Sequence, residues 1–254
     1  MNSAVQTARI VTVARRIALG FASAALLLAA SAAAVLAYPQ PLFSYHVERG
    51  RLALYSDLPF DAHKAEALLD EVDRRISRSA LDRGDGVHRI FVANAAWRAR
   101  LTFLWTYGAG GVNFSPLTRN VFIRRSDVDA NRVISSLGPV PPPRTLAYFA
   151  AHEIGHSLIA EHIGAVANWQ LPVWVREGLA DYIAFGGDVD IPALMRQFRA
   201  GERDLDPKRS GLYARYRLLV AHFLHSEGWT IDRLLTSGMP QSEAEMRLLA
   251  FQGN

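Results

Sequence analysis

The spacing of hydrophobic residues changes along this chain, and each spacing predicts a kind of local structure. Residues 17–37 form an uncharged run of 21 residues, and a helix of that length spans about 30 Å, enough to cross a bilayer core. Residues 43–55, 87–93 and 120–124 have the alternation or the short apolar runs that are typical of strands. Residues 61–78 instead repeat apolar side chains at helical spacing and predict a helix with Asp61 as its N-cap.

The second half of the chain is predicted to be mainly helical. A glycine-rich turn at 108–111 precedes the strand at 120–124, and the prolines within 138–143 make a stiff, non-helical connector. A helix should follow and end before Gly164, with a loop at 165–171 leading to the next helix. Further helices are predicted at 192–199, 211–227, 231–235 and 243–251. These elements indicate an α+β fold, with a small N-terminal mixed sheet and a mainly helical C-terminal part.

The first forty residues are expected to lie outside this fold. Arg9, Arg15 and Arg16 precede the apolar run, so the N-terminus should face the cytoplasm and the rest of the chain should lie outside it. The small residues of 35–37 offer a cleavage site for a signal peptide, whereas the length of the run favours an uncleaved anchor. Residues 1–40 are therefore a signal peptide or a transmembrane anchor, and residues 41–254 a single domain.

Charge and cysteine content exclude several classes of protein. The formal net charge is +4, but three of the arginines lie before residue 17, which leaves 25 basic against 24 acidic residues in the rest of the chain. Without a basic patch, nucleic acid is not an expected partner. The chain contains no cysteine, which excludes disulfides, a thiol nucleophile and thiolate metal sites.

The candidate chemistry lies in a short motif, His152-Glu153-Ile154-Gly155-His156. On a helix, residues four apart share a face, so the two imidazoles can reach one metal ion with the carboxylate of Glu153 beside them. The flanking residues are too apolar for a solvated helix, and polar groups in a buried helix have to be paired or bound to metal. The motif therefore predicts a metal site with two histidine ligands.

Two residues are candidates for the third ligand. His162 has the spacing of the metzincin pattern, but Ile159 occupies the position where that pattern needs a glycine to break the helix. If the helix continues, His162 points away from the ion and suits the helix end. The other candidate is Glu177, on the next predicted helix. Asp181 shares its face four residues later and could accept the second ring N–H of a ligand histidine.

The residues His152, Glu153, His156 and Glu177, followed by Gly-Leu-Ala-Asp-Tyr at 178–182, resemble the gluzincin metallopeptidases. The match runs from about residue 144 to 235 and is most similar to the compact peptidase MA-like domains. The resemblance implies a zincin-like domain in which His152, His156 and Glu177 bind Zn²⁺. It also implies that Glu153 is the general base and that Asp181 supports a ligand histidine.

The same resemblance bears on two further features. Gluzincins carry a tyrosine about fifteen residues before a glycine, and Tyr213 stands at that distance from Gly228. Tyr213 is therefore the first candidate for the donor that stabilises the oxyanion, and Tyr216 the second, while both could equally be core residues. The strand at 120–124 could pair with an extended substrate, or be an ordinary strand of the sheet. The histidines at 222 and 225 are interpreted as surface residues.

These features predict a zinc peptidase in the cell membrane or periplasm, acting on peptide or protein substrates. Glu153 would take a proton from water activated by the metal. The chain would meet the membrane through its N-terminal helix if that helix is uncleaved. One alternative is a non-catalytic zinc-binding envelope protein that uses the same scaffold to bind a peptide or protein partner. The other is a metzincin with His162 as the third ligand.

Overall fold

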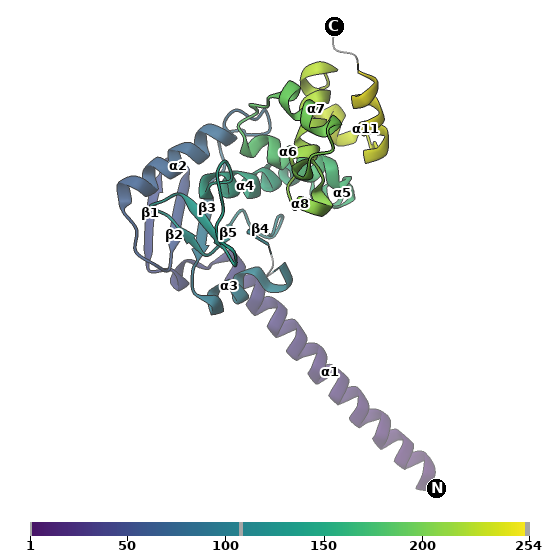
Figure 1. Cartoon of the computed structure of the whole chain (residues 1–254). Coiled ribbons are helices and arrows are strands. Elements are labelled where there is room, and N and C mark those ends of the chain that lie inside the picture. Colours follow the sequence, from purple (N-terminus) through teal and green to yellow (C-terminus); the bar gives the residue numbers. More distant parts are fainter. Residues whose placement is uncertain (1, 107–108, 252–254) are drawn as a thin grey trace. The chain divides into compact units, whose positions relative to one another are not determined.

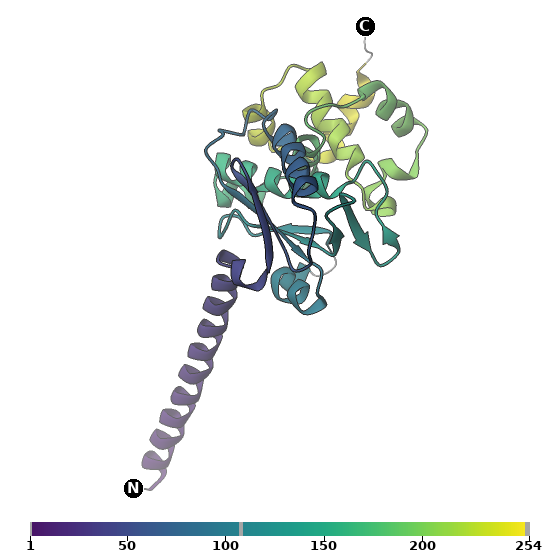
Figure 2. The same cartoon turned by 90° about the vertical axis from the view of Figure 1, so that its left-hand side faces the viewer.

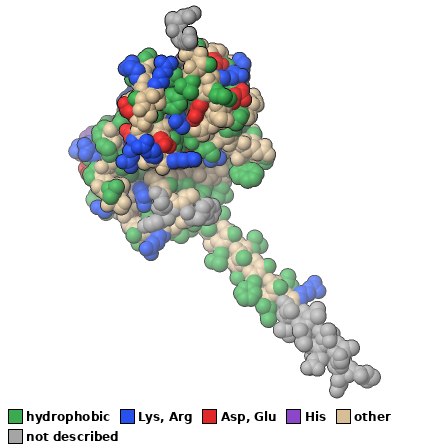
Figure 3. All heavy atoms as spheres, turned by 45° about the vertical axis from the view of Figure 1, so that its right-hand side comes forward, with side chains coloured by type: hydrophobic (Ala, Val, Ile, Leu, Met, Phe, Trp, Pro, Cys, Tyr) green, Lys and Arg blue, Asp and Glu red, His purple; other side chains and the backbone are tan. Residues whose placement is uncertain are grey.

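The computed structural model describes residues 2–106 and 109–251, which divide into two units, Met1–Pro41 and Leu42–Asn254. The first unit is the helix α1 (Asn2–Ala37), followed by the short 3-10 turn η1 (Gln40–Leu42) at the boundary. Within the described residues, Arg15–Ala37 is the one helical segment long and apolar enough to cross a membrane, and a signal sequence has the same properties. Figure 3 shows this helix covered with hydrophobic side chains.

The second unit begins with a mixed five-stranded sheet, as the sequence predicted. Its strands lie in the order β1-β2-β3-β5-β4. Their bounds are β1 Tyr45–Arg49, β2 Leu52–Ser56, β3 His88–Ala93, β5 Val121–Arg124 and β4 Gly111–Asn113. The central pairs β2–β3 and β3–β5 are parallel, whereas both edge strands run antiparallel to their neighbours. The predicted strand at 43–55 is divided in two because Gly50 adopts φ +60° and turns the chain back.

Alternating side chains of the sheet build two different layers. Ile90 and Val92 join the main hydrophobic core, which the helices α2 (Ala62–Ile76) and α4 (Leu146–Ile163) cover. Phe91 points to the opposite face, where its ring contacts those of Tyr55 and Phe122. The helix α3 (Ala96–Phe103) and the 3-10 turn η2 (Leu104–Thr106) follow β3, and α3 packs against β3 and β5. Figures 1 and 2 show α2 and α4 on the other side of the sheet.

The helix predicted at 61–78 is confirmed, whereas the connector predicted at 138–143 is confirmed only in part. The helix α2 (Ala62–Ile76) begins where predicted, and the Asp61 side chain accepts a hydrogen bond from the Lys64 backbone N–H at 3.0 Å. The connector at 138–143 is only partly a connector, because its first two residues pair as a strand. They form a small antiparallel sheet of β6 Ser126–Asp127, β7 Arg132–Ser135 and β8 Gly138–Pro139.

The C-terminal part is helical, as predicted. Its elements are α4 Leu146–Ile163, α5 Ala165–Gln170, α6 Val173–Ala184, α7 Ile191–Arg199, η3 Arg203–Leu205, α8 Pro207–Ser210, α9 Ala214–Ala221, η4 His222–Ser226, α10 Ile231–Thr236 and α11 Gln241–Ala250. The loop expected at 165–171 is the short helix α5. The helix expected at 211–227 begins later and continues as a π-helical turn, η4.

Two glycines let the helices α4, α6 and α9 approach closely. A Cβ at Gly155 of α4 would lie 3.1 Å from the Cα of Ala180 on α6. A Cβ at Gly178 of α6 would lie 2.6 Å from the backbone oxygen of Tyr216 on α9. A side chain at Gly178 would force the helices apart, since real Cβ atoms essentially never come this close to backbone. A side chain at Gly155 would make an unusually tight contact, which α6 could accept only by shifting slightly. The three helices therefore bring the motif, Glu177 and Tyr213 into one region.

Candidate metal centre

The helix α4 holds the two histidines of the motif inside the protein. It begins at the N-cap Thr145, whose side chain accepts a hydrogen bond from the Tyr148 backbone N–H, and it ends at Gly164. Nearly every residue between them is buried, so α4 is covered on all sides. His152 is 5% exposed. The rings of His152 and His156 lie 4.9 Å apart and perpendicular to each other.

Glu177 of α6 completes a group that could hold a metal ion. Its Oε2 lies 3.6 Å from Nε2 of His152 and 3.5 Å from Nε2 of His156. Two ligands at about 2.1 Å from a tetrahedral ion are about 3.4 Å apart, so these spacings fit such an ion. In the part of the chain that the structure describes, these three residues form the one such group of histidines and carboxylates. Burial alone would raise the pKa of Glu177, but the two imidazoles outweigh burial and hold the pKa well below its usual range.

Glu153 lies in the same cavity with its carboxylate against the sheet. Its side chain is buried, and a Cβ added at Gly111 of β4 would lie 2.8 Å from both Cγ and Oε1 of Glu153. Burial raises the pKa of Glu153 to about 7; the nearby His156 lowers it and Glu177 raises it. The close approach of Glu153 thus requires a glycine at position 111. The sequence could not predict this requirement, because a glycine-rich segment does not indicate which side chain will pack against it.

Asp181 lies beside the His152 ring, although both of its oxygens are already bonded. Oδ1 accepts the hydroxyl of Tyr148, and Oδ2 accepts an N–H of Arg217 at 2.6 Å. Oδ1 is 3.9 Å from Nδ1 of His152, which is beyond hydrogen-bond distance, and this Nδ1 is buried without a partner. Asp181 therefore places a negative charge next to the imidazole and joins α4, α6 and α9.

Tyr213 stands at the start of α9, with its ring stacked on His152. The ring centroids are 5.5 Å apart and the planes differ by 6°. Burial, and then the charges of Glu177 and Glu153, raise the pKa of Tyr213, so its hydroxyl remains a hydrogen-bond donor. The ring centroid of Tyr216 lies 6.1 Å from that of Tyr213. Tyr216 is not among the described residues that line the cleft beside the metal-binding group.

The metal-binding group opens into a cleft of about 820 Å³. Its lining includes His152, Glu153, His156, Glu177 and Tyr213, but not Asp181. The cleft continues past Gly110 and along the strand β4, at Gly111, Val112 and Asn113. The strand β5 at 121–124 is internal, between β3 and β4, so it is an ordinary strand of the sheet. The edge strand at the cleft is β4, which begins at the last residue of the turn predicted at 108–111. Residue 108 of that turn is outside the described residues.

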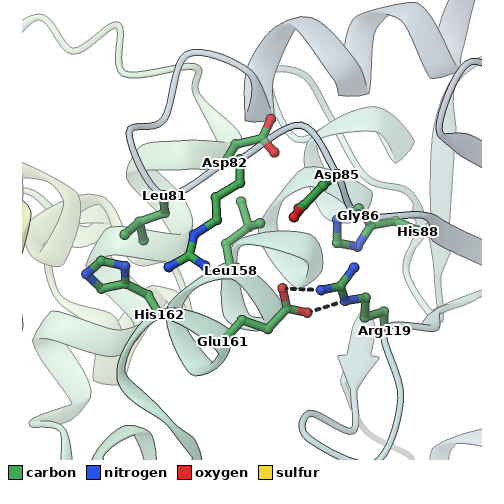
Figure 4. Close-up of a pocket in the computed structure, with 10 residues that line it drawn as sticks. Leu81, Asp82, Asp85, Gly86, His88, Arg119, Leu158, Glu161 and His162 are labelled. Carbon is green, nitrogen blue, oxygen red and sulfur yellow. Dashed lines mark hydrogen bonds and ion pairs between the residues drawn. The ribbon is translucent and has the colours of Figure 1, made fainter.

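His162 lies apart from the metal-binding group. Its Nε2 is 2.5 Å from Oδ1 of Asp232, and it lines a separate cavity of about 290 Å³ (Figure 4). Arg119 and Glu161 form an ion pair in that cavity. His88 is buried there, and burial, followed by the charges of Arg119 and another arginine, lowers its pKa to about 4. Among the described residues, none lines both this cavity and the cleft beside the metal-binding group.

Of the two histidines predicted to lie at the surface, His222 and His225, only one does so. His225 is exposed and contacts the Tyr182 hydroxyl at 2.9 Å. His222 is 1% exposed, and its Nε2 lies 3.3 Å from Oε1 of Glu227, so the prediction of a surface residue is wrong for it. The π-helical turn rotates this segment relative to a regular α-helix, which sequence periodicity does not reveal.

Neither a scan against protein-family models nor a search of curated proteins finds a match for this chain. What is established is a mixed α+β fold, an apolar N-terminal helix and a group of two histidines and one glutamate that could bind a metal ion.

Proposed function

We propose that this protein is a zinc peptidase of the gluzincin type, which hydrolyses peptide bonds outside the cytoplasm. The observation that carries the proposal is the spacing of His152, His156 and Glu177, which fits a tetrahedral ion, in a cleft that also holds Glu153. Two imidazoles and a carboxylate are a donor set of catalytic zinc, which leaves one position open. Zinc held there would supply a Lewis acid that polarises a carbonyl and makes water more acidic.

The role of Glu153 is to move a proton. Its carboxylate lines the cleft beside the three candidate ligands. It would take a proton from the attacking water and pass it to the leaving nitrogen, which is general base catalysis followed by general acid catalysis. Gly111 keeps the space that this side chain needs.

Tyr213 would donate a hydrogen bond to the oxyanion that forms as the carbonyl is attacked. Its ring is fixed against His152, and its hydroxyl stays protonated. A fixed donor stabilises charge that develops in the transition state at little cost of reorganisation. Tyr216 is the weaker candidate because it lies behind Tyr213.

The edge of β4 would hold the substrate. This strand is paired with β5 on one side, and no described strand covers its other side. An extended peptide can add to such an edge through backbone hydrogen bonds, a mode that is tolerant of sequence. The peptide would then lie along the cleft, past Gly111 and Asn113.

The proposed location follows from α1. A signal peptide and an anchor both carry the second unit out of the cytoplasm, because Arg15 and Arg16 precede the apolar segment. An anchored enzyme would act at the membrane surface and a cleaved one in the periplasm.

The test is the substitution Glu153→Gln, assayed with zinc analysis and a peptide-library digest. We expect the variant to keep its zinc and to lose nearly all turnover, because the amide cannot accept the proton. Normal cleavage by this variant would show that Glu153 is not the general base. Zinc binding by the wild type without cleavage of any peptide would instead support a non-catalytic zinc-binding protein.

A further inference from the structure

Arg144 lines the same cleft as the two histidines, from a position just before the active-site helix. The helix α4 begins at Leu146 with Thr145 as its N-cap, and Arg144 precedes both. Tyr148, His152 and His156 follow at intervals of four on α4, and they line the cleft together with Arg144.

The guanidinium of Arg144 is held in place by aromatic rings. Its Cζ lies 5.0 Å from the ring centroid of Phe149 and 6.0 Å from that of Tyr148. Contact with a ring face leaves the N–H groups at the edge of a guanidinium available to acceptors. Among the described residues, Nε of Arg144 is buried without a hydrogen-bond partner. A buried donor in this state is costly until it finds an acceptor.

The other charged side chains near Arg144 are not paired with it. The cleft lining contains two carboxylates: Glu177, which belongs to the metal-binding group, and Glu153, which lies beside it. Arg176, the other arginine of the lining, lies 3.3 Å from Glu177. In the adjoining cavity, the oxygens of Asp181 are bonded to a tyrosine and an arginine, and Asp204 is exposed. Among the described residues, Arg144 forms no ion pair, and the neighbouring pairs join Arg176 to Glu177 and Arg217 to Asp181.

A side cavity of about 280 Å³ shares a wall with the cleft. Arg144, Tyr148 and Tyr213 line both spaces. The remaining lining of the side cavity is apolar at Pro143, Phe185, Leu194, Leu205 and Leu212, and its charged members are the paired Asp181 and Arg217 and the exposed Asp204. A substrate group that reaches the shared wall would meet Arg144 beside the aromatic rings of Tyr148 and Tyr213.

We propose that Arg144 binds a carboxylate of the substrate and gives the enzyme a preference for peptides that carry a carboxylate near the cleaved bond. This inference rests on the proposed function. A guanidinium pairs with a carboxylate through two parallel hydrogen bonds, whether the carboxylate is a chain terminus or an Asp or Glu side chain. Hydrogen bonds to charged groups of this kind correspond to a preference of about tenfold or more.

The experiment compares matched peptides on the zinc-loaded full-length protein. One set has blocked ends and carries Glu or Gln at each of the four positions on either side of the cleaved bond. The other set has a neutral sequence that ends in a free carboxylate or in an amide. The wild type should favour the acidic member of at least one pair about tenfold in kcat/KM. The pair that shows the preference identifies the source of the carboxylate.

The variants ask whether Arg144 causes this preference. Arg144→Gln and Arg144→Met should bring the ratio of acidic to neutral substrate close to one. Arg144→Met keeps apolar contact with Phe149 and serves if Arg144→Gln folds poorly, as judged by circular dichroism and zinc content. Arg199→Gln removes the same charge from an exposed position of α7 and should keep the wild-type ratio. A wild type without any preference, or an Arg144 variant that retains it, would overturn the inference.

Binding separates this inference from the proposed function. The same peptide pairs, labelled with a fluorophore, are titrated with protein and followed by anisotropy. Charge-selective binding that depends on Arg144, without cleavage of any peptide, would support the inference and contradict the proposed function. If the peptides are cleaved and neither cleavage nor binding depends on their charge, the proposed peptidase function stands and the role of Arg144 is refuted.

Discussion

The substitution Asp181→Ala should destabilise the fold itself, independently of any metal. The Asp181 side chain is 2% exposed and that of Arg217 is 13% exposed, and they are joined at 2.6 Å. Removing the carboxylate leaves Arg217 without its counterion and the Tyr148 hydroxyl without its acceptor. Breaking a buried pair in this way costs about 3–5 kcal/mol. We therefore expect a loss of that size in the free energy of unfolding.

The assay is urea unfolding of the purified protein, followed by tryptophan fluorescence, with excess chelator so that metal binding does not contribute. Arg49 and Asp70 supply the control, since their ion pair of 3.0 Å is about half exposed on both sides. Asp70→Ala should change the free energy of unfolding little, because solvent screens an exposed pair. A double-mutant cycle with Asp181→Ala and Arg217→Met should show coupling of about 0.5–3 kcal/mol. Equal losses for Asp181→Ala and Asp70→Ala, with no coupling, would refute this reasoning.

Three further predictions concern helix packing, pH and the base. Gly178→Ala should cost about 1–3 kcal/mol in urea unfolding, because its Cβ would meet the Tyr216 backbone. The pKa of His88 is about 4 in the folded protein and ordinarily 6.5. As the pH falls, the unfolded chain therefore binds the proton before the folded protein does. The contribution of His88 to the free energy of unfolding is constant above pH 6.5 and falls by about 3 kcal/mol as the pH decreases toward 4. His88→Gln should flatten this pH dependence, as measured by urea unfolding at several pH values. Gly111→Ala should keep zinc but lower kcat about 100-fold by displacing Glu153, as measured on a cleaved peptide.

Each of these has a result that would contradict it. Unchanged stability of the Gly178 variant would mean that α6 and α9 are not in close contact. A pH dependence that His88→Gln leaves intact would assign it to other groups. Full activity of the Gly111 variant would show that Glu153 has room to move without loss.

Periodicity and capping residues predicted the main elements because these signals are local. The Asp61 cap and the apolar spacing of 61–78 specify α2 within a few residues. The strand β4 could not be predicted in the same way, since Gly111–Asn113 has little strand propensity of its own. It becomes a strand through pairing with β5, where Val112 lies opposite Phe122.

The candidate site was predictable in its residues and not in its packing. Helical geometry places His152 and His156 together, and chain length allows Glu177 to reach them. What brings Glu177 close is the contact of α4 with α6 at Gly155, and that contact depends on tertiary structure. The same holds for Arg144, whose free charge becomes visible only when its neighbours are known.

Zinc titration of the purified protein, after removal of metal, tests the central claim most directly. The account predicts one tight site in the wild type, its loss or severe weakening in Glu177→Ala, and an unchanged site in His162→Ala. Unaltered zinc affinity in Glu177→Ala, or loss of zinc in His162→Ala, would contradict the ligand set of His152, His156 and Glu177.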